Sequence, residues 1–293
     1  MNIEKIKSIL LFAFAGIAII MIVMIGINES RYTLSAAQEE SVLSLLERSG
    51  ISFQAEMTRD FSPMRPILLD TTAPNTEEIA VRFFGDNSFV AEEQAGHRIL
   101  SLEGRRRQLI YSMADNIIVL DIPGGLANPD FLAAGAQGAV GLAVDYIEAI
   151  FGMPDSLEFV SNILNFRGDY IISFFGSYGG HLVLNNHIRV RVTEIGITQI
   201  TFSYMPILGF SEEYMPLSSA DEILVSLVSH LRRSGVSTHG IIVSNMQLVY
   251  YMPNIASAQA TPTYILTLII NDILFNYLFD ARTNTFLRYE IIR

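Results

Sequence analysis

The chain has 293 residues, a formal net charge of −11, 50% hydrophobic residues and no cysteine. Without cysteine it has neither disulfides nor thiolate metal sites, so an exported domain must depend on its hydrophobic core for stability. The acidic balance also argues against nucleic acid as a partner, because binding to phosphates requires clustered Lys and Arg side chains.

The first predicted element is an apolar helix at residues 9–27, which contains no charged and no strongly polar side chain. At about 1.5 Å per residue it matches the roughly 30 Å hydrocarbon core of a bilayer. Lys5 and Lys7 precede it and are the only lysines, so the positive-inside rule places residues 1–8 in the cytoplasm. The rest, with 17 arginines against 29 carboxylates and therefore a net charge of −12, is expected outside the cell membrane.

This span is predicted to stay on the protein as a single-pass transmembrane helix. A cleaved signal peptide is the alternative, but the apolar run is longer than the roughly 7–15 residues of such a peptide. The helix could be a passive tether, or it could pack on partner helices. Ala13, Ala15, Gly16 and Ala18 would allow close approach of a partner backbone. Their spacing is not GxxxG, so the residues alone favour the tether.

Further helices are predicted where capping residues precede apolar residues at helical spacing. Ser35 with Gln38 and Ser219 with Glu222 have the spacing of capping boxes, and Thr76 is a third candidate N-cap. The predicted helices are Ser35–Arg48, Thr76–Phe84, Pro129–Gly152 and Ser219–Arg233. The third contains Asp145 and Glu148, which indicates a nearly buried helix rather than a second membrane span.

Strands are predicted where apolar runs or alternating patterns lie between turn residues. They cover residues 51–57, 98–102, 107–113, 116–122, 159–165, 170–177, 187–194, 198–204, 238–251, 264–270, 274–279 and 286–291. Because the strands follow one another rather than alternating with helices, the predicted class is α+β, with antiparallel sheets each packed by helices. We divide the exported part into two helix-plus-sheet modules, residues 28–127 and 128–293.

An internal repeat suggests that the modules are related. Ser41–Ser52 matches Ser226–Ser237 at seven of twelve positions with a constant offset of 185. A duplicated helix–Gly–strand module would explain the match. Helix capping alone also favours Arg-Ser-Gly at a helix end, so both explanations stay open.

No constellation of residues for catalysis or metal binding is recognisable, and we expect no enzyme, metal or cofactor. The five histidines lack the short spacings of metal sites, although His181 and His187 would approach each other if the five residues between them formed a hairpin. Phe175–Gly180 is rich in glycine but matches neither a nucleophile elbow nor a phosphate loop, so it is predicted to be a turn. Arg105, Arg106 and Arg107 could contact anionic headgroups or a partner's carboxylates, or could simply form a solvated turn.

Four features resemble one family. They are a short Lys-containing segment before a single span, Tyr32-Thr33-Leu34-Ser35 followed by Gln38-Glu39, the segment Phe61–Pro66, and the C-terminal strands around Tyr250-Tyr251 and Asp280–Thr285. Together they resemble the YycI branch of the YycH/YycI regulatory proteins of low-GC Gram-positive bacteria. The chain departs from that pattern in having no tryptophan, and Asn284 stands where a glycine is common.

The resemblance implies a membrane-anchored accessory protein of a two-component system that controls cell-wall metabolism. The implied partners are a sensor histidine kinase and a YycH-type sister protein, with the membrane helix taking part in the contact. No catalytic residue comes with the family. The alternative is an anchored extracytoplasmic binding module, on a PepSY-like scaffold, for a peptide, a wall fragment or a protease.

Overall fold

The structure is a computed structural model of residues 1–293, and it describes residues 14, 16–18, 21, 31–86, 88–102, 107–126, 135–154, 157–164 and 168–292. The chain folds into two compact units, each assembled from separate stretches of sequence. Unit 1 comprises residues 1–64, 215–247 and 264–292, and unit 2 comprises residues 65–214 and 248–263. The predicted module boundary at residue 127 falls within the sequence range of unit 2, and the two modules stay a prediction.

The fold is mixed α+β, dominated by antiparallel strand pairs, as the order of predicted elements indicated. The described helices are α2 (Ala36–Arg48), α3 (Thr76–Phe84), α5 (Gly135–Phe151), α6 (Ala220–Arg233) and the short η1 (Ile255–Ser257). The strands are β1 (Ile51–Phe53), β2 (Ile67–Leu69), β3 (Phe89–Gln94), β4 (His97–Leu102), β5 (Gln108–Ser112), β6 (Ile117–Leu126), β7 (Leu157–Leu164), β8 (Tyr170–Tyr178), β9 (His181–Thr193), β10 (Gly196–Ser203), β11 (Ile207–Phe210), β12 (Ile241–Tyr251), β13 (Gln259–Ile270), β14 (Ile273–Asp280) and β15 (Phe286–Ile292).

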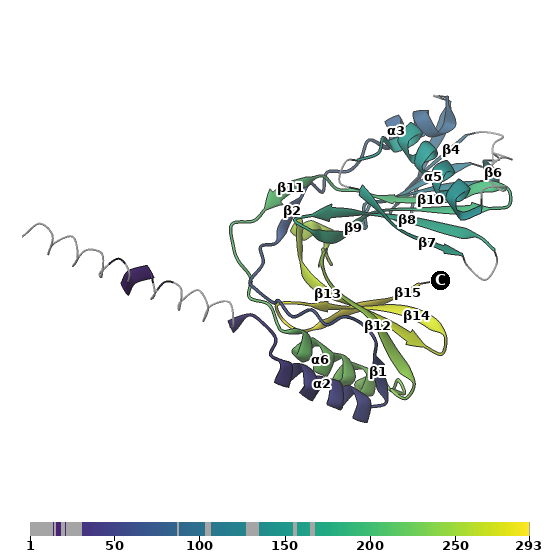
Figure 1. Ribbon diagram of the computed structural model, residues 1–293. Coiled ribbons are helices and arrows are strands. Elements are labelled where there is room, and N and C mark those ends of the chain that lie inside the picture. The colour runs from purple at the N-terminus through teal and green to yellow at the C-terminus, as the bar shows by residue number, and fades with distance from the viewer. Residues whose placement is uncertain are drawn as a thin grey trace, which may run out of the picture. The chain divides into compact units, whose positions relative to one another are not determined.

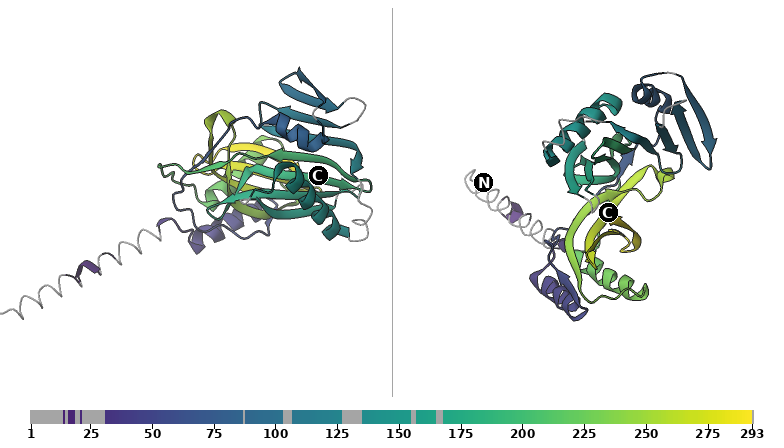
Figure 2. Two further views of the ribbon diagram at one scale, coloured as in Figure 1. Left: turned by 90° about the horizontal axis from the view of Figure 1, so that it is seen from above. Right: turned by 90° about the vertical axis from the view of Figure 1, so that its right-hand side faces the viewer.

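Unit 1 packs two helices together against a small sheet. α2 and α6 lie side by side, as Figures 1 and 2 show, and α6 also contacts β15. In the sheet, β1 runs parallel to the start of β12, and β14 and β15 form an antiparallel hairpin beside β13. The buried stripe of α6 includes Ile223, Leu224, Leu227, Val228 and Leu231, which repeat at helical spacing. Hydrophobic burial therefore holds α6 in place and leaves its polar face free.

The predicted helix starts of unit 1 are confirmed. Ser35 and Gln38 exchange hydrogen bonds in a capping box, in which the Gln38 N–H donates to Ser35 Oγ and the Ser35 N–H donates to Gln38 Oε1. At α6 the Ser219 N–H donates to the Glu222 carboxylate at 3.1 Å. These bonds satisfy N–H groups that have no partner inside the helix. They explain why both helices begin where the sequence indicated.

Both copies of the internal repeat lie in unit 1, where their helices contact each other. The match covers two helix ends, each followed by a glycine with positive φ, Gly50 and Gly235. Beyond the glycines the copies differ, because β1 begins at Ile51, directly after Gly50, whereas β12 begins only at Ile241. The repeat is therefore a helix with its terminating turn, and only the first copy continues directly into a strand.

Unit 2 is a mostly antiparallel sheet packed by α3 and α5. Its strands follow the order β12-β9-β10-β6-β5-β4-β3, with β8 beside β9 and β7 beside β8. The part of β12 in unit 2 runs parallel to β9, and β2 pairs with β11 and with the start of β13. The core lies between this sheet and the two helices, where small residues of α5 such as Ala139 and Ala143 are completely buried. Small side chains let the helix approach the strands closely.

The structure corrects several local predictions. Asn75, not Thr76, caps α3, because the Asn75 side chain accepts the Glu78 N–H while Thr76 is already helical. β3 was not predicted, because its polar, mostly exposed sequence lacks the pattern of a half-buried strand. His181 and His187 lie on the single strand β9 rather than on two arms of a hairpin, so the expected approach between them does not occur.

The predicted membrane span lies mostly outside the described residues. Only residues 14, 16–18 and 21 of it are described, and they are helical. In the described part of the chain, no helix combines the length and the apolar character needed to cross a bilayer.

Candidate functional site

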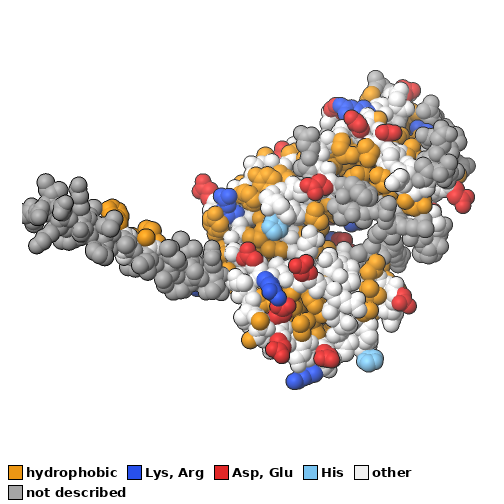
Figure 3. All heavy atoms as spheres, viewed as in Figure 1, with side chains coloured by type: hydrophobic (Ala, Val, Ile, Leu, Met, Phe, Trp, Pro, Cys, Tyr) orange, Lys and Arg blue, Asp and Glu red, His pale blue; other side chains and the backbone are white. Residues whose placement is uncertain are grey.

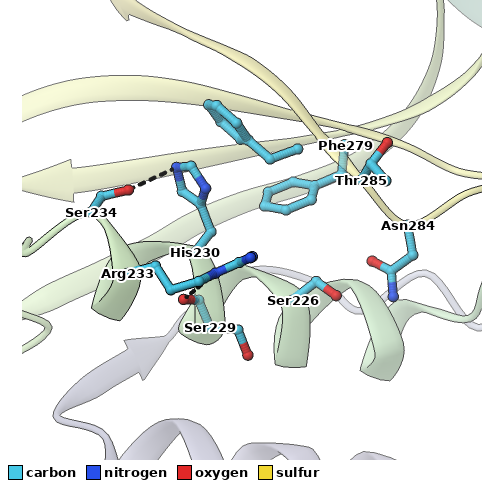
Figure 4. Close-up of a pocket in the computed structure, with 9 residues that line it drawn as sticks. Ser226, Ser229, His230, Arg233, Ser234, Phe279, Asn284 and Thr285 are labelled. Carbon is cyan, nitrogen blue, oxygen red and sulfur yellow. Dashed lines mark hydrogen bonds between the residues drawn. The ribbon is translucent and has the colours of Figure 1, made fainter.

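A partly open cavity of about 500 Å³ lies in unit 1 between α6 and the β14–β15 hairpin (Figure 4). The volume is within the roughly 300–1,000 Å³ typical of small-ligand sites. The helix supplies Ser226, Ser229, His230, Arg233 and Ser234 to its lining, and the hairpin supplies Phe279, Asn284, Thr285 and Phe286. The lining thus combines one fixed cation, several hydroxyl groups and two aromatic rings, and it contains no carboxylate.

The polar face of α6 forms the helix wall of the cavity. Ser226, Ser229 and Arg233 lie on this face because they are spaced by one helical turn. Arg233 Nε donates to the Ser229 carbonyl oxygen at 3.3 Å, so the guanidinium group lies back along the helix, as Figure 4 shows. Among the described residues no carboxylate forms an ion pair with Arg233. Its charge is therefore available to the cavity.

The hairpin wall carries the Phe279 and Phe286 rings, which pack on each other and on His230 of α6. The His230 imidazole stacks on the Phe286 ring with 3.8 Å between centroids and 24° between planes. Phe279 meets Phe286 edge-on at 5.7 Å and also meets His230 edge-on. Burial, together with the nearby Arg233 cation, lowers the pKa of His230, so its imidazole stays neutral near pH 7. Arg233 is consequently the one full positive charge in the cavity lining.

Asn284 closes the cavity at the hairpin turn. Asp280 builds this turn, since its Oδ1 accepts the N–H groups of Arg282 and Thr283. Asn284 adopts a left-handed conformation with φ of 55°, which Asn tolerates better than most residues. Its Nδ2 donates to the Glu222 carbonyl oxygen of α6 at 3.2 Å. Its Oδ1 is shielded from solvent and accepts a hydrogen bond from none of the described residues.

A second feature of unit 1 is the docking of the segment that follows the predicted span. Thr33 forms an antiparallel bridge with Asp60, the Leu34 N–H donates to the Arg59 carbonyl at 2.8 Å, and the Phe61 N–H donates to the Tyr32 carbonyl at 2.9 Å. Leu34 is only 4% exposed, and Tyr32 meets Phe61 edge-on at 6.2 Å. The residues at 32–34 are therefore fixed to unit 1 by backbone pairing as well as by burial.

The described part of the chain contains no group of three or more His, Asp or Glu side chains that could hold a metal ion. His181 Nδ1 pairs with the Leu248 carbonyl, and His187 Nδ1 pairs with the Leu184 carbonyl. These contacts with backbone carbonyls give both β9 histidines a structural explanation. Acidic side chains are dispersed over the face of the molecule in Figure 3 rather than gathered into one patch.

The predicted contact residues are only partly described. Ala13, Ala15, Arg105 and Arg106 lie outside the described residues. Gly16 is half-buried and Ala18 is exposed in the described helical residues of the N-terminal segment. Arg107 is half-buried. Burial of Tyr146 raises the pKa of its hydroxyl group, and the nearby charge of Arg107 partly opposes this increase. The contact role of all these residues stays a prediction.

Sequence reasoning did not single out Arg233 or His230. The available signal was the polar stripe on α6 opposite its apolar stripe, but such a stripe is typical of any solvated helix face. Asn284 was identified as an unusual residue for this turn, but no role for its side-chain amide was evident from the sequence. Only the packing of the hairpin on α6 brings these residues to one cavity.

Comparison with known proteins gives structural likeness but no family. No family model matches the chain, and no curated protein matches it. Among solved structures, an uncharacterized protein from Eubacterium rectale is similar, with a TM-score of 0.49, 12% identity, and coverage of 85% of this chain and 98% of that one.

Two other similar structures have assigned names. The C-terminal domain of YpeB from Bacillus megaterium has a TM-score of 0.40 and 10% identity, over 74% of this chain and 95% of that one. YycH from Bacillus subtilis has a TM-score of 0.46 and 15% identity, over 76% of this chain and 55% of that one. The chain thus spans about half the length of the YycH structure. Likeness at this level does not transfer a function.

Proposed function

We propose that the chain is a membrane-anchored accessory regulator that modulates a sensor histidine kinase of a two-component system controlling cell-wall metabolism. The resemblance to the YycI branch supplies the kinase and a YycH-type sister protein as partners. The single structural observation that carries the regulatory role is the docking of residues 32–34 on residues 59–61 in unit 1. A passive tether would not require residues 32–34 to be fixed to unit 1.

The docked segment matters because of its position. In the sequence only residues 28–30 separate the predicted span from Arg31, the first residue of the continuously described chain. A displacement or rotation of the span would therefore be transmitted to the docked residues 32–34 through only a few residues. An accessory protein acts on a two-state kinase by contacting its two states differently. A short, fixed connection transmits such differences, whereas a flexible linker would absorb them.

The described residues of the N-terminal segment support a contact role for the span. Phe14, Ile17 and Met21 are 64%, 51% and 61% exposed and lie three and four positions apart, on one helical face. We place this helix in the cell membrane, with residues 1–8 in the cytoplasm and the units outside. The contact surface on the kinase is then a membrane helix that packs on this face or on the small residues beside it.

Exchange of residues 9–27 for an unrelated membrane span tests the proposal. We expect transcription from the response regulator's target promoters to change, while the exported units stay folded by limited proteolysis. Insertion of Gly-Ser-Gly-Ser between Ser30 and Arg31 should have a similar effect, because it separates the span from the docked segment. The same insertion between Glu212 and Glu213, in an exposed loop of unit 2, is the matched control. Unchanged transcription in both the span-exchange variant and the variant with the insertion after Ser30 would count against helix-mediated regulation.

The cavity of unit 1 favours a second candidate, an anchored extracytoplasmic binding module. Its volume suits a small ligand, and its polar lining includes a cation without an acidic partner among the described residues. In that case the span would be interchangeable, and ligand binding would be the measurable activity. Span exchange therefore distinguishes the two candidates.

A further inference from the structure

We propose that the edge strand β15 of unit 1 pairs with β15 of a second copy of this chain, in an antiparallel arrangement centred on Tyr289. The two copies would then share one continuous sheet, with a twofold axis at Tyr289. This inference goes beyond the kinase proposal and does not depend on it.

Strand β15 is an open edge of the sheet in unit 1. Among the described strands it pairs with β14 alone (Figure 1). An edge strand offers a row of backbone N–H and C=O groups to another strand, and proteins usually protect such an edge with lysine or proline. β15 contains neither residue. Its backbone can therefore accept a further strand.

The apolar side chains near this edge are exposed. Tyr289 stacks on Tyr277 of β14 with 5.6 Å between centroids, yet it is 54% exposed. Ile291 lies two residues further along the same face of the strand and is 43% exposed. In the proposed pairing, Tyr289 would lie directly opposite Tyr289 of the second copy, and Ile291 would lie diagonally beside it. Pairing would therefore bury both side chains.

The order of charges selects a second copy as the partner. Arg288 and Glu290 flank Tyr289 on the opposite face of β15, and they form an ion pair at 3.1 Å. In an antiparallel pair centred on Tyr289, Arg288 lies directly opposite Glu290 of the second copy, and Glu290 lies opposite Arg288. The four side chains would form a cluster of alternating charges. Opposite charges at facing positions stabilise a strand pair.

The same two charges also fix the register. A pairing centred on Arg288 would place two arginines directly opposite each other, and a pairing centred on Glu290 would do the same with two glutamates. Like charges at facing positions are destabilising. The charges therefore favour Tyr289 as the centre.

The edge strand β3 of unit 2 lacks this complementarity. Among the described strands β3 pairs with β4 alone, and it carries Glu92 and Glu93 without a cation. A second β3 would add further acidic side chains with no positive charge to balance them. This strand therefore provides a control edge for experiments on β15.

Cysteine cross-linking tests the pairing, because the natural chain contains no cysteine. The probe is the full-length Tyr289→Cys protein in detergent, oxidised with copper phenanthroline. Facing residues in an antiparallel pair have Cα atoms about 4.5–5.5 Å apart, which is within the range of a disulfide, so a covalent dimer should form. Val90→Cys, at an exposed position of β3, is the matched control and should stay monomeric.

Charge exchange in the Tyr289→Cys background tests the identity of the partner. Arg288→Glu or Glu290→Arg alone places like charges at facing positions, so each should lower the dimer yield at least about fivefold. An equal mixture of the two variants brings a strand with two glutamates beside a strand with two arginines. A heterodimer should then form with the yield of the Tyr289→Cys protein. Arg82→Glu, which reverses one charge of an exposed ion pair in unit 2, is the control and should leave the yield unchanged.

The proposal is overturned if Tyr289→Cys forms no covalent dimer, or if Val90→Cys forms as much. It is also overturned if the charge variants cross-link as well as the parent, or if their mixture does not restore the yield, since the substitutions would then act on folding alone. The result is separable from the kinase proposal, because the predicted span is intact in every variant.

Discussion

In unit 2 the side chain of Asn186 is completely buried, and both ends of its amide are used. Its Nδ2 donates to the Met205 carbonyl at 2.8 Å, and its Oδ1 accepts the Met205 N–H at 2.9 Å. In unit 1 the amide of Asn284 uses only its Nδ2, and its Oδ1 is buried without a partner among the described residues. One asparagine uses both ends of its amide, whereas the other leaves a solvent-shielded oxygen without a partner among the described residues.

One glycine from each unit gives a second contrast. In unit 2, a Cβ added to Gly125 would lie 2.2 Å from the Ile195 carbonyl oxygen, so the two strand ends approach as closely as glycine permits. In unit 1, a Cβ added to Gly235 at the end of α6 would meet nothing within 4 Å. The contrast holds for these two positions and not for whole units, since a Cβ added to Gly50 of unit 1 would lie 3.1 Å from His239 Cα. We therefore expect the substitution at Gly125 to destabilise the fold more than the substitution at Gly235.

The largest difference should come from the glycines. Gly125→Ala combines a positive φ of 63° with a backbone clash, and should lower the free energy of unfolding by about 3–5 kcal/mol. Gly235→Ala has a similar φ of 69° but no clash, and should cost only about 1 kcal/mol. Urea denaturation of both variants measures the difference. Equal losses would show that the close approach at Gly125 is relieved by movement of the Ile195 turn.

The two asparagines provide the next comparison. Asn186→Ala leaves the Met205 N–H and carbonyl buried without partners, and should cost about 3 kcal/mol. Asn284→Gly keeps the left-handed backbone and removes the orphan Oδ1 together with one hydrogen bond, so stability should change by less than about 1 kcal/mol. Thermal unfolding followed by circular dichroism gives both values. A loss at Asn284 as large as that at Asn186 would mean that its amide is chiefly structural.

The smallest effect concerns pH. Burial, together with the nearby Arg189 cation, lowers the pKa of His187 in unit 2 to about 4. The unfolded chain takes up a proton on this histidine below about pH 6.5, whereas the folded chain does so only near pH 4. Its contribution to stability is therefore essentially complete above pH 6.5 and falls by about 2.5 kcal/mol as the pH decreases to 4.5.

Denaturation curves at pH 7 and pH 4.5 test this effect, with His187→Gln as the variant that should lose it. His97→Gln, which removes an exposed histidine from β4, is the control. The prediction is wrong if the wild-type chain and His187→Gln lose the same stability between these two pH values.

The sequence by itself determined the features that depend on neighbouring residues. The capping boxes at Ser35 and Ser219 and the apolar stripe of α6 are local patterns, so they located the helices of unit 1. The succession of strands without intervening helices was likewise sufficient to predict the α+β class. The polar sequence of β3 was missed, because an exposed strand has no hydrophobic alternation to indicate it.

Only the tertiary structure decided which distant residues meet. Arg233 and Asn284 are 51 positions apart, and no periodicity connects a helix face with the turn of a later hairpin. The division into units was also invisible locally, because each unit combines separate stretches of chain that hydrophobic burial and strand pairing bring together. Interactions between neighbouring residues determine where helices and turns form. The cavity exists because two elements that are separate in sequence bury their apolar sides together and leave polar groups facing the space between them.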